Sequence, residues 1–163
     1  MPIKTITIDG IPKGQPRPRF ANIGSFVKVY DPSCKIKKEI AKIISEQWVD
    51  DIITSPIEMK IVFYMPIPKS LSKKKKKAII EDDSRHSKKP DIDNLIKMPL
   101  DVMNGLVYHD DNQIWRIEGL RIYDENPRTE IILRYGMNEK LKYCYHAIKK
   151  WLSSVYEQWK AEE

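Results

Sequence analysis

Apolar and polar residues alternate near the start of the chain, where residues 3–9 read Ile-Lys-Thr-Ile-Thr-Ile-Asp. Successive side chains of a strand point to opposite faces, so this alternation predicts a β-strand. Further strands are predicted at residues 26–30, 57–65, 114–123 and 129–135. The turn-forming run Asp124-Glu125-Asn126-Pro127 joins the last two of these strands.

Apolar residues that recur every three or four positions predict helices. One helix is expected at residues 32–50, with Asp31 as its cap and Pro32 in its first turn. A second helix is expected from about Asp93 to Asn104. Pro99 lacks a backbone donor and should kink this helix or delay its start, which bears on the reach of Lys97.

A third apolar stripe runs from residue 138 to the end of the chain and predicts a C-terminal helix. We expect residues 1–136 to form one domain and residues 137–163 a helical extension, packed on that domain or in a dimer interface. Strands mixed with helices predict an α/β (α+β) fold, in which helices flank a mixed β-sheet.

The net charge of +6 is concentrated in one segment. Residues 69–89 hold nine basic and three acidic side chains, so this segment alone carries the whole net charge. A run of like charge repels itself and predicts a solvated loop or a mobile arm. Such an arm suits binding to the phosphates of a polyanion. The basic residues of interest are Lys73, Lys74, Lys75, Lys76, Lys77, Lys88 and Lys89.

A second basic element follows the first strand, where Lys-Gly-Gln-Pro-Arg-Pro-Arg spans residues 13–19. Its prolines exclude a helix, and Arg17 and Arg19 are candidate phosphate contacts on an extended loop. The chain shows neither a signal peptide nor an apolar run of the ~20 residues that a membrane span needs. We therefore expect a cytoplasmic protein with no membrane partner.

Acidic residues cluster directly after the basic segment. Asp91 and Asp93 stand two residues apart at the start of the expected helix, and Lys97 follows Asp93 by one helical turn. Asp110 or Asp111 would approach from a loop. Carboxylates are the ligands that Mg²⁺ prefers, and paired metal ions with a nearby lysine suit phosphodiester hydrolysis.

The same residues allow a purely structural interpretation. Asp93 is a plausible helix cap. Asp93, Lys97 and Asp101 form a possible surface ladder of ion pairs, worth only ~0.3–0.5 kcal/mol per pair. The acidic pair at residues 110–111 suits a simple turn. Spacing alone leaves the metal site and the structural interpretation about equally supported.

Three segments together resemble the RusA family of Holliday junction resolvases. They are residues 91–97 (Asp-Ile-Asp-Asn-Leu-Ile-Lys), 100–108 (Leu-Asp-Val-Met-Asn-Gly-Leu-Val-Tyr) and 110–114 (Asp-Asp-Asn-Gln-Ile). The loop at residues 13–19 looks like the N-terminal loop of phage and Gram-positive members. The resemblance covers roughly residues 3–135, and the C-terminal helix lies outside it.

The resemblance implies a homodimeric, magnesium-dependent endodeoxyribonuclease, with Mn²⁺ as a possible substitute and no other cofactor. Paired sites would nick opposed strands of branched DNA in recombination and repair, giving 5′-phosphate and 3′-hydroxyl ends. The family's essential residues fall on Asp91, Asp93, Asp111 and Lys97. Asp110 matches the adjacent acid and is a further candidate metal ligand.

Other functions remain open at this point. One is a nuclease that prefers flaps, forks or single strands, because junction preference depends on dimer geometry. Another is a branched-DNA-binding protein without catalysis, which would bind DNA without cutting it. A small-nucleotide phosphodiesterase fits the long lysine run poorly. A bacterial or prophage origin is expected in either case.

Overall fold

Four strands form a mixed sheet in the order β1-β6-β4-β5. They are β1 (Ile3–Asp9), β4 (Ile57–Pro66), β5 (Ile114–Asp124) and β6 (Arg128–Tyr135). β4 is central, parallel to β5 and antiparallel to β6, and β1 pairs antiparallel with β6 at the opposite edge. The computed structural model describes residues 2–23, 26–81 and 85–136. The expected C-terminal helix from residue 138 lies outside the described residues.

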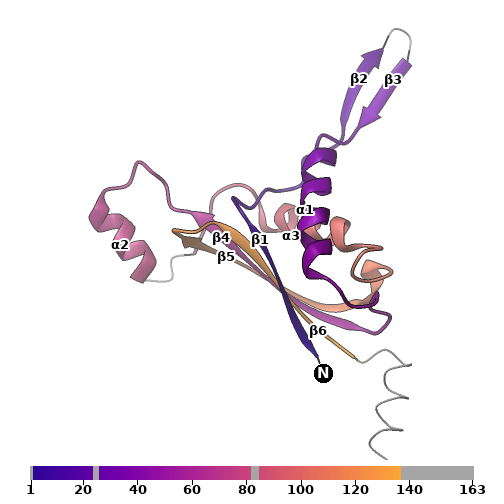
Figure 1. Ribbon diagram of the computed structural model, residues 1–163. Coiled ribbons are helices and arrows are strands. Elements are labelled where there is room, and N and C mark those ends of the chain that lie inside the picture. The colour runs from indigo at the N-terminus through magenta and orange to yellow at the C-terminus, as the bar shows by residue number, and fades with distance from the viewer. Residues whose placement is uncertain (1, 24–25, 82–84, 137–163) are drawn as a thin grey trace, which may run out of the picture.

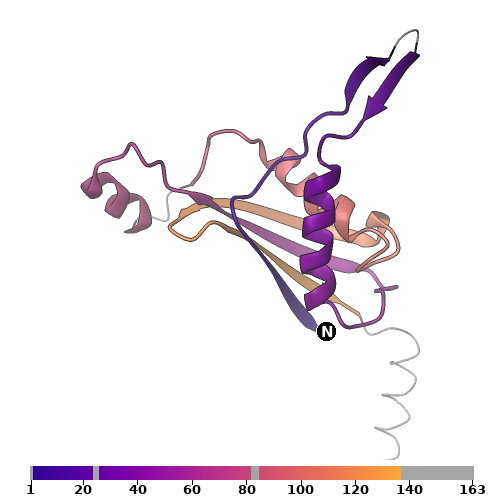
Figure 2. The same cartoon turned by 45° about the horizontal axis from the view of Figure 1, so that its top comes forward.

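Helices α1 (Cys34–Gln47) and α3 (Ile92–Met103) lie side by side on one face of the sheet (Figures 1 and 2). Their apolar sides meet the strand residues that point inward, and the central strand β4 is buried along most of its length. The core includes these fully buried side chains: Ile6, Ile44, Ile57, Met59, Ile61, Leu95, Met103, Tyr108, Ile131 and Leu133. Burial of each aliphatic side chain contributes about 1.5–3 kcal/mol relative to exposure.

The opposite face of the sheet carries a ladder of ion pairs, beside apolar residues such as Leu120 and Ile132. Glu58 on β4 pairs with Arg116 on β5 at 3.0 Å and with Arg134 on β6 at 3.3 Å. Lys60 and Glu118 pair across the same two parallel strands at 3.5 Å. Alternation along the strands therefore places the helix-covered core residues on one face and the ion pairs on the other.

Gly119 allows α3 to approach β5 closely. A Cβ atom at this position would lie 2.7 Å from Ile96 Cδ1 and 3.2 Å from Ile92 Cδ1. Both isoleucines belong to the first half of α3, so this half of the helix rests on the middle of β5. A larger residue at 119 would push the helix away from the sheet.

Two elements extend from this body (Figure 1). Strands β2 (Arg19–Ile23) and β3 (Phe26–Tyr30) form a separate antiparallel hairpin that projects beyond the N-terminal end of α1. Helix α2 (Lys73–Glu81) lies beyond the far end of β4 and β5. None of the helices within the described ranges is long and apolar enough to cross a membrane.

The predicted fold class is confirmed, with two differences among these elements. The expectation of a loop or mobile arm for the lysine run was wrong for residues 73–81, which form α2. β2 was not predicted. The turn near Asp124 does join β5 to β6, but β4 lies between these two strands in the sheet.

Pro99 was expected to cause a kink or a late start, and the late start does not occur, because helix α3 begins at Ile92 and continues through Pro99 to Met103. Pro99 is buried against the rest of the domain, where its ring adds apolar contact. The helix ends before Gly105, whose φ of +74° lies in the left-handed region that favours glycine. Gly105 therefore acts as the predicted stop.

Candidate active site

Asp91 and Asp93 stand at the N-terminal end of α3. Asp91 is the residue before the helix, with an extended backbone, and its side chain makes no capping hydrogen bond. Asp93 lies in the first turn. Both side chains are exposed to solvent, so their oxygens are accessible to a ligand. Negative charge is also favoured at this end of a helix.

The segment that leads into α3 is held by contacts on two sides. Arg121 on β5 donates from Nη1 to the carbonyl of Lys88 at 3.0 Å and to that of Pro90 at 2.7 Å. On the other side, the backbone N–H of Gln15 donates to the carbonyl of Asn94 at 2.9 Å. These bonds fix the backbone around Asp91 and leave its carboxylate uncovered.

Gly14 makes the second of these contacts possible. A Cβ atom at residue 14 would lie 3.0 Å from Pro90 Cβ and 3.3 Å from Asn94 Cβ. The basic loop of residues 13–19 therefore packs directly on the start of α3. Arg17 and Arg19 follow this contact along the chain and are exposed, and Arg19 is the first residue of β2.

Lys97 lies one turn after Asp93, and its Nζ is 3.7 Å from Asp93 Oδ2. The two side chains are 61% and 63% exposed, and an exposed pair at this distance contributes little to stability. Pro99 thus leaves Lys97 beside the acidic end of the helix. Of the expected ladder of ion pairs, the Asp93–Lys97 pair therefore forms, at the long distance of 3.7 Å.

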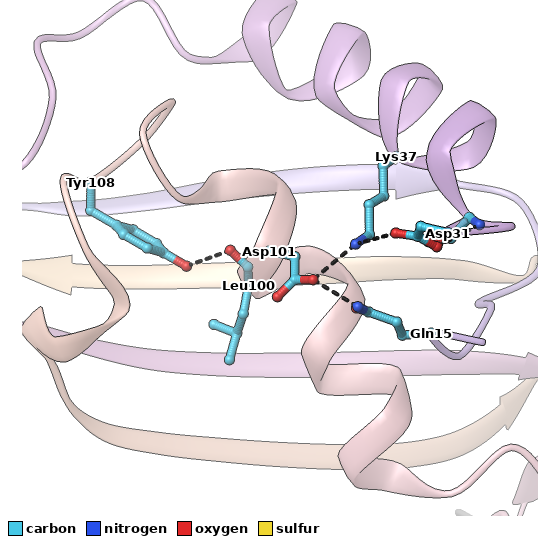
Figure 3. A network of polar contacts seen from close by, with 7 residues as sticks. Gln15, Asp31, Lys37, Leu100, Asp101 and Tyr108 are labelled. Atoms are coloured by element: carbon cyan, nitrogen blue, oxygen red, sulfur yellow. Dashed lines mark hydrogen bonds and ion pairs between the residues drawn. The ribbon is translucent and has the colours of Figure 1, made fainter. Parts of the chain in front are cut away.

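Asp101 has other partners, so the ladder does not extend to it. Its Oδ2 accepts from Lys37 Nζ at 2.9 Å and from Gln15 Nε2 at 2.7 Å. Lys37 also bonds Asp31 at 3.0 Å. Figure 3 shows this chain of contacts, which we call the Asp101 clamp and define as Gln15, Asp31, Lys37 and Asp101.

The clamp changes the ionisation of its acids. Burial raises the pKa of Asp101, but the hydrogen bonds from Lys37 and Gln15 outweigh it, so the pKa is lowered. Hydrogen bonds from Ser33 and then from Lys37 lower the pKa of Asp31 from 3.8 to about 2. Both carboxylates are therefore held ionised as partners of Lys37.

Asp110 and Asp111 lie at the other end of α3. Asp110 accepts from the backbone N–H of Asn112 at 2.8 Å and caps the short helix η1 (Asp111–Gln113). The Gln113 side chain donates to the Ile53 carbonyl at 2.9 Å, which ties this turn to the core. Asp110 thus has a structural role, whereas the exposed Asp111 makes no capping bond.

Tyr108 connects this turn to the C-terminal half of the helix. Its hydroxyl donates to the Leu100 carbonyl at 3.1 Å (Figure 3). Burial raises the pKa of Tyr108, and the nearby charges of Asp111, Asp101 and Asp110 raise it further. The Asp110–Asp111 turn therefore borders the C-terminal half of α3.

The predicted metal ligands fall into two groups in one chain. Asp91 and Asp93 are at the start of α3, and Asp111 is beyond its end; the 12-residue helix between them is about 18 Å long at ~1.5 Å per residue. Within residues 2–23, 26–81 and 85–136, no three His, Cys, Asp or Glu side chains lie close enough to hold one metal ion. The expectation that Asp111 reaches the same pocket is not met in a single chain.

The predicted DNA contacts lie on several elements. Lys88 and Lys89 are exposed directly before Asp91, Arg17 is on the N-terminal loop, and Arg19 begins β2. Residues 73–77 form the first half of α2, further from this end of α3 (Figure 1). The positioning roles of Gln15, Lys37 and Arg121 were not predicted, since nothing local in the sequence marks their long-range partners.

Comparisons with known proteins found one matching family and one similar protein. The family model described as endodeoxyribonuclease RusA matches residues 9–134. The chain is also 37% identical over 132 residues to the uncharacterized protein YqaN of Bacillus subtilis (strain 168), which covers 78% of this chain and 93% of that protein. The chain therefore belongs to the RusA family of endodeoxyribonucleases.

Proposed function

We propose that this protein is a magnesium-dependent endodeoxyribonuclease that resolves four-way DNA junctions by paired, symmetric nicks. The observation that carries the proposal is the exposed carboxylate pair Asp91 and Asp93, held at the start of α3 beside Lys97. Membership of the RusA family supports the same activity. The exposed Lys88 and Lys89 directly before this pair support a polyanionic substrate.

The donor set at the start of α3 fits a hard divalent cation. Mg²⁺ is bound through one or two carboxylates together with waters and substrate phosphates, and Asp91 and Asp93 offer two accessible carboxylates. When bound, Mg²⁺ would supply Lewis-acid stabilisation of charge on the phosphate. Mn²⁺ is expected to substitute, because it accepts the same oxygen ligands.

The chain's own residues have separate tasks in this proposal. Arg17, Arg19, Lys88 and Lys89 hold phosphates on either side of the scissile bond, and the lysines of α2 hold DNA further away. Lys97 donates to the oxygen on which negative charge develops, which a positioned cation stabilises most in the transition state. Arg121 keeps the Asp91 backbone fixed through its two carbonyl contacts. The expected products carry 5′-phosphate and 3′-hydroxyl ends.

A homodimer is part of the proposal, because symmetric nicks on opposed strands need two sites. Because Asp111 is separated from Asp91 and Asp93 within one chain, we further propose that the dimer brings Asp111 of one copy toward Asp91 of the other.

Mixing two inactive variants tests this idea directly. Asp91→Asn and Asp111→Asn chains are each expected to be inactive, and their mixture should regain part of the activity if the ligands come from two chains.

The experiment for the function is cleavage of a substrate panel of equal length and sequence composition. The panel holds a four-way junction, a 5′ flap, a fork, a single strand and a linear duplex, each tested with Mg²⁺ and with chelator. We expect paired nicks in the junction that depend on Mg²⁺, and far slower cleavage of the other substrates. Ligation of the nicked products without further treatment would establish 5′-phosphate and 3′-hydroxyl ends.

Other outcomes would replace the proposal by a defined alternative. If the flap, fork or single strand is cut faster than the four-way junction, the protein is a nuclease that prefers that DNA structure. Tight junction binding without cleavage in Mg²⁺ or Mn²⁺ would leave a branched-DNA-binding protein.

A further inference from the structure

The β2–β3 hairpin exposes large apolar side chains where a soluble domain usually hides them. Phe20 is 72% exposed and Phe26 is 78% exposed, and Val27, Val29 and Tyr30 are also exposed. The hairpin projects away from the sheet in both views (Figures 1 and 2). A two-stranded hairpin is marginally stable alone, so aromatic residues that add little to the core point to contact with a partner.

The strand register divides these side chains between two faces. Arg19 stands opposite Tyr30, and alternation places Phe26 on the same face as Tyr30. Phe20 stands opposite Val29, and Val27 shares their face. One face therefore combines an arginine with two aromatic rings, and the other carries Phe20, Val27 and Val29. We call the first the aromatic face of the hairpin.

Both ends of the hairpin are fastened to α3 through the Asp101 clamp. Gln15, before β2, donates to Asp101, and Asp31, directly after β3, is joined to Asp101 through Lys37 (Figure 3). The backbone of Gln15 also bonds Asn94 in the first turn of α3. The hairpin is thus attached to the helix that carries Asp91, Asp93 and Lys97.

We propose that the aromatic face of the hairpin binds bases that lose their stacking partners at the branch point of the DNA. This inference rests on the proposed function and adds the element that distinguishes branched from linear DNA. Aromatic rings stack on bases of any sequence, and an arginine beside them adds attraction to phosphate and to ring faces. In a linear duplex the bases are already stacked, so the rings have no equivalent contact.

The test uses two matched double variants of the full-length protein. Phe26→Leu with Tyr30→Leu removes both rings of the aromatic face but keeps apolar bulk. Val27→Thr with Val29→Thr changes the opposite face by the same number of residues and keeps β-branched side chains. Junction and duplex affinities are measured by fluorescence anisotropy at one salt concentration, without divalent metal so that the DNA stays intact. Tyr30→Phe, which retains a ring, serves as the rescue variant.

We expect the aromatic-face variant to bind the junction at least about tenfold more weakly and the duplex within twofold of wild type, since stacking contributes per base. The opposite-face variant and Tyr30→Phe should bind both DNAs like wild type. A 2-aminopurine placed at the branch point should change its fluorescence with wild type but not with the aromatic-face variant. The same probe placed within a duplex arm should not respond.

Three results would overturn the inference. They are unchanged junction binding by the aromatic-face variant, an equal loss on junction and duplex, and equal losses from both double variants. A change of oligomeric state in light scattering, with unchanged DNA binding, would assign the hairpin to a second copy of the chain. Failure of the proposed function is recognised separately in the cleavage assay, where wild type would then make no metal-dependent nicks in the junction.

Discussion

The first and last turns of α3 each carry an aspartate, but the protein uses the two side chains differently. Asp93 is 63% exposed, and its nearest cation, Lys97, stands 3.7 Å away. Asp101, about two turns later, accepts bonds of 2.7 and 2.9 Å from Gln15 and Lys37. One carboxylate is left accessible, and the other is part of a fastened network.

The difference indicates which acids serve the fold and which serve a ligand. The Asp101 clamp satisfies its own charges and joins three parts of the chain, so its loss should be felt in stability. Asp91 and Asp93 contribute little that the fold needs, and their backbone is nonetheless fixed by Arg121 and Gln15. A binding site requires side chains that are free to contact a ligand on a backbone that is held in place, and Asp91 and Asp93 meet both conditions.

The largest expected effect separates these two aspartates. Asp93→Asn should slow single-turnover junction cleavage by more than the ~10–100-fold that loss of an outer-shell partner of a metal costs. Its thermal stability should stay near that of wild type. Asp101→Asn should retain cleavage within several-fold but lose about 1 kcal/mol of unfolding free energy. Similar cleavage by the two variants would remove the distinction between the two regions.

A second prediction concerns Lys97. Lys97→Ala should lower the maximal cleavage rate by roughly 10²–10³-fold, as removal of a donor to a developing charge does, with a smaller change in junction affinity. Lys97→Arg should recover part of the rate. Lys42→Ala is the matched control, since Lys42 and Glu46 form an exposed pair of the same spacing on α1. Equal effects of the two alanine variants would argue against a catalytic role.

A third prediction concerns the position of α3 on the sheet. Gly119→Val should lower the unfolding free energy by about 1–3 kcal/mol, because the new side chain meets Ile96 and Ile92. Adding Ile96→Ala to this variant should restore part of the loss, so the double variant is less unstable than the sum of the single ones. Urea unfolding of all four proteins measures this coupling. Strict additivity would contradict a direct contact.

The smallest expected effect is the acid response of the Asp101 clamp. The folded-state pKa values of Asp31 and Asp101 are lowered, so folding favours their ionised forms. Their contribution is fully present above the usual pKa of 3.8 and is lost as pH falls toward about 2. Stability measured by urea unfolding across this window should fall less steeply for Asp101→Asn than for wild type. An identical slope would show that the clamp is not coupled to protonation.

Much of the sheet and the acidic end of α3 could be predicted from the sequence because the signals are local. Residues 3–9 alternate between apolar and polar side chains, and residues 57–65 are mostly apolar, as in a buried strand. Asp91, Asp93 and Lys97 lie within two helical turns of one another. β2 was missed because its hairpin buries no face, so Phe20 follows no alternation with polar residues. The lysine run forms α2 and not a loop, because the helix propensity of lysine and alanine outweighs the repulsion between like charges.

The remaining features depend on contacts between distant residues. Asp101 bonds Gln15 and Lys37, and Arg121 bonds the lead-in to α3, and no spacing rule links these positions. The insertion of β4 between β5 and β6 likewise follows from the three-dimensional path of the chain. Gly119 did carry a readable signal, since a glycine inside a strand pattern often marks close approach of another element.

The most direct test of the central claim compares wild type with Asp91→Asn on a labelled four-way junction in Mg²⁺, with a linear duplex as control. Binding and cleavage are measured on the same samples. The account predicts paired symmetric nicks from wild type, and junction binding without nicks from Asp91→Asn. Cleavage by Asp91→Asn at the wild-type rate, or no cleavage by wild type in either Mg²⁺ or Mn²⁺, would contradict it.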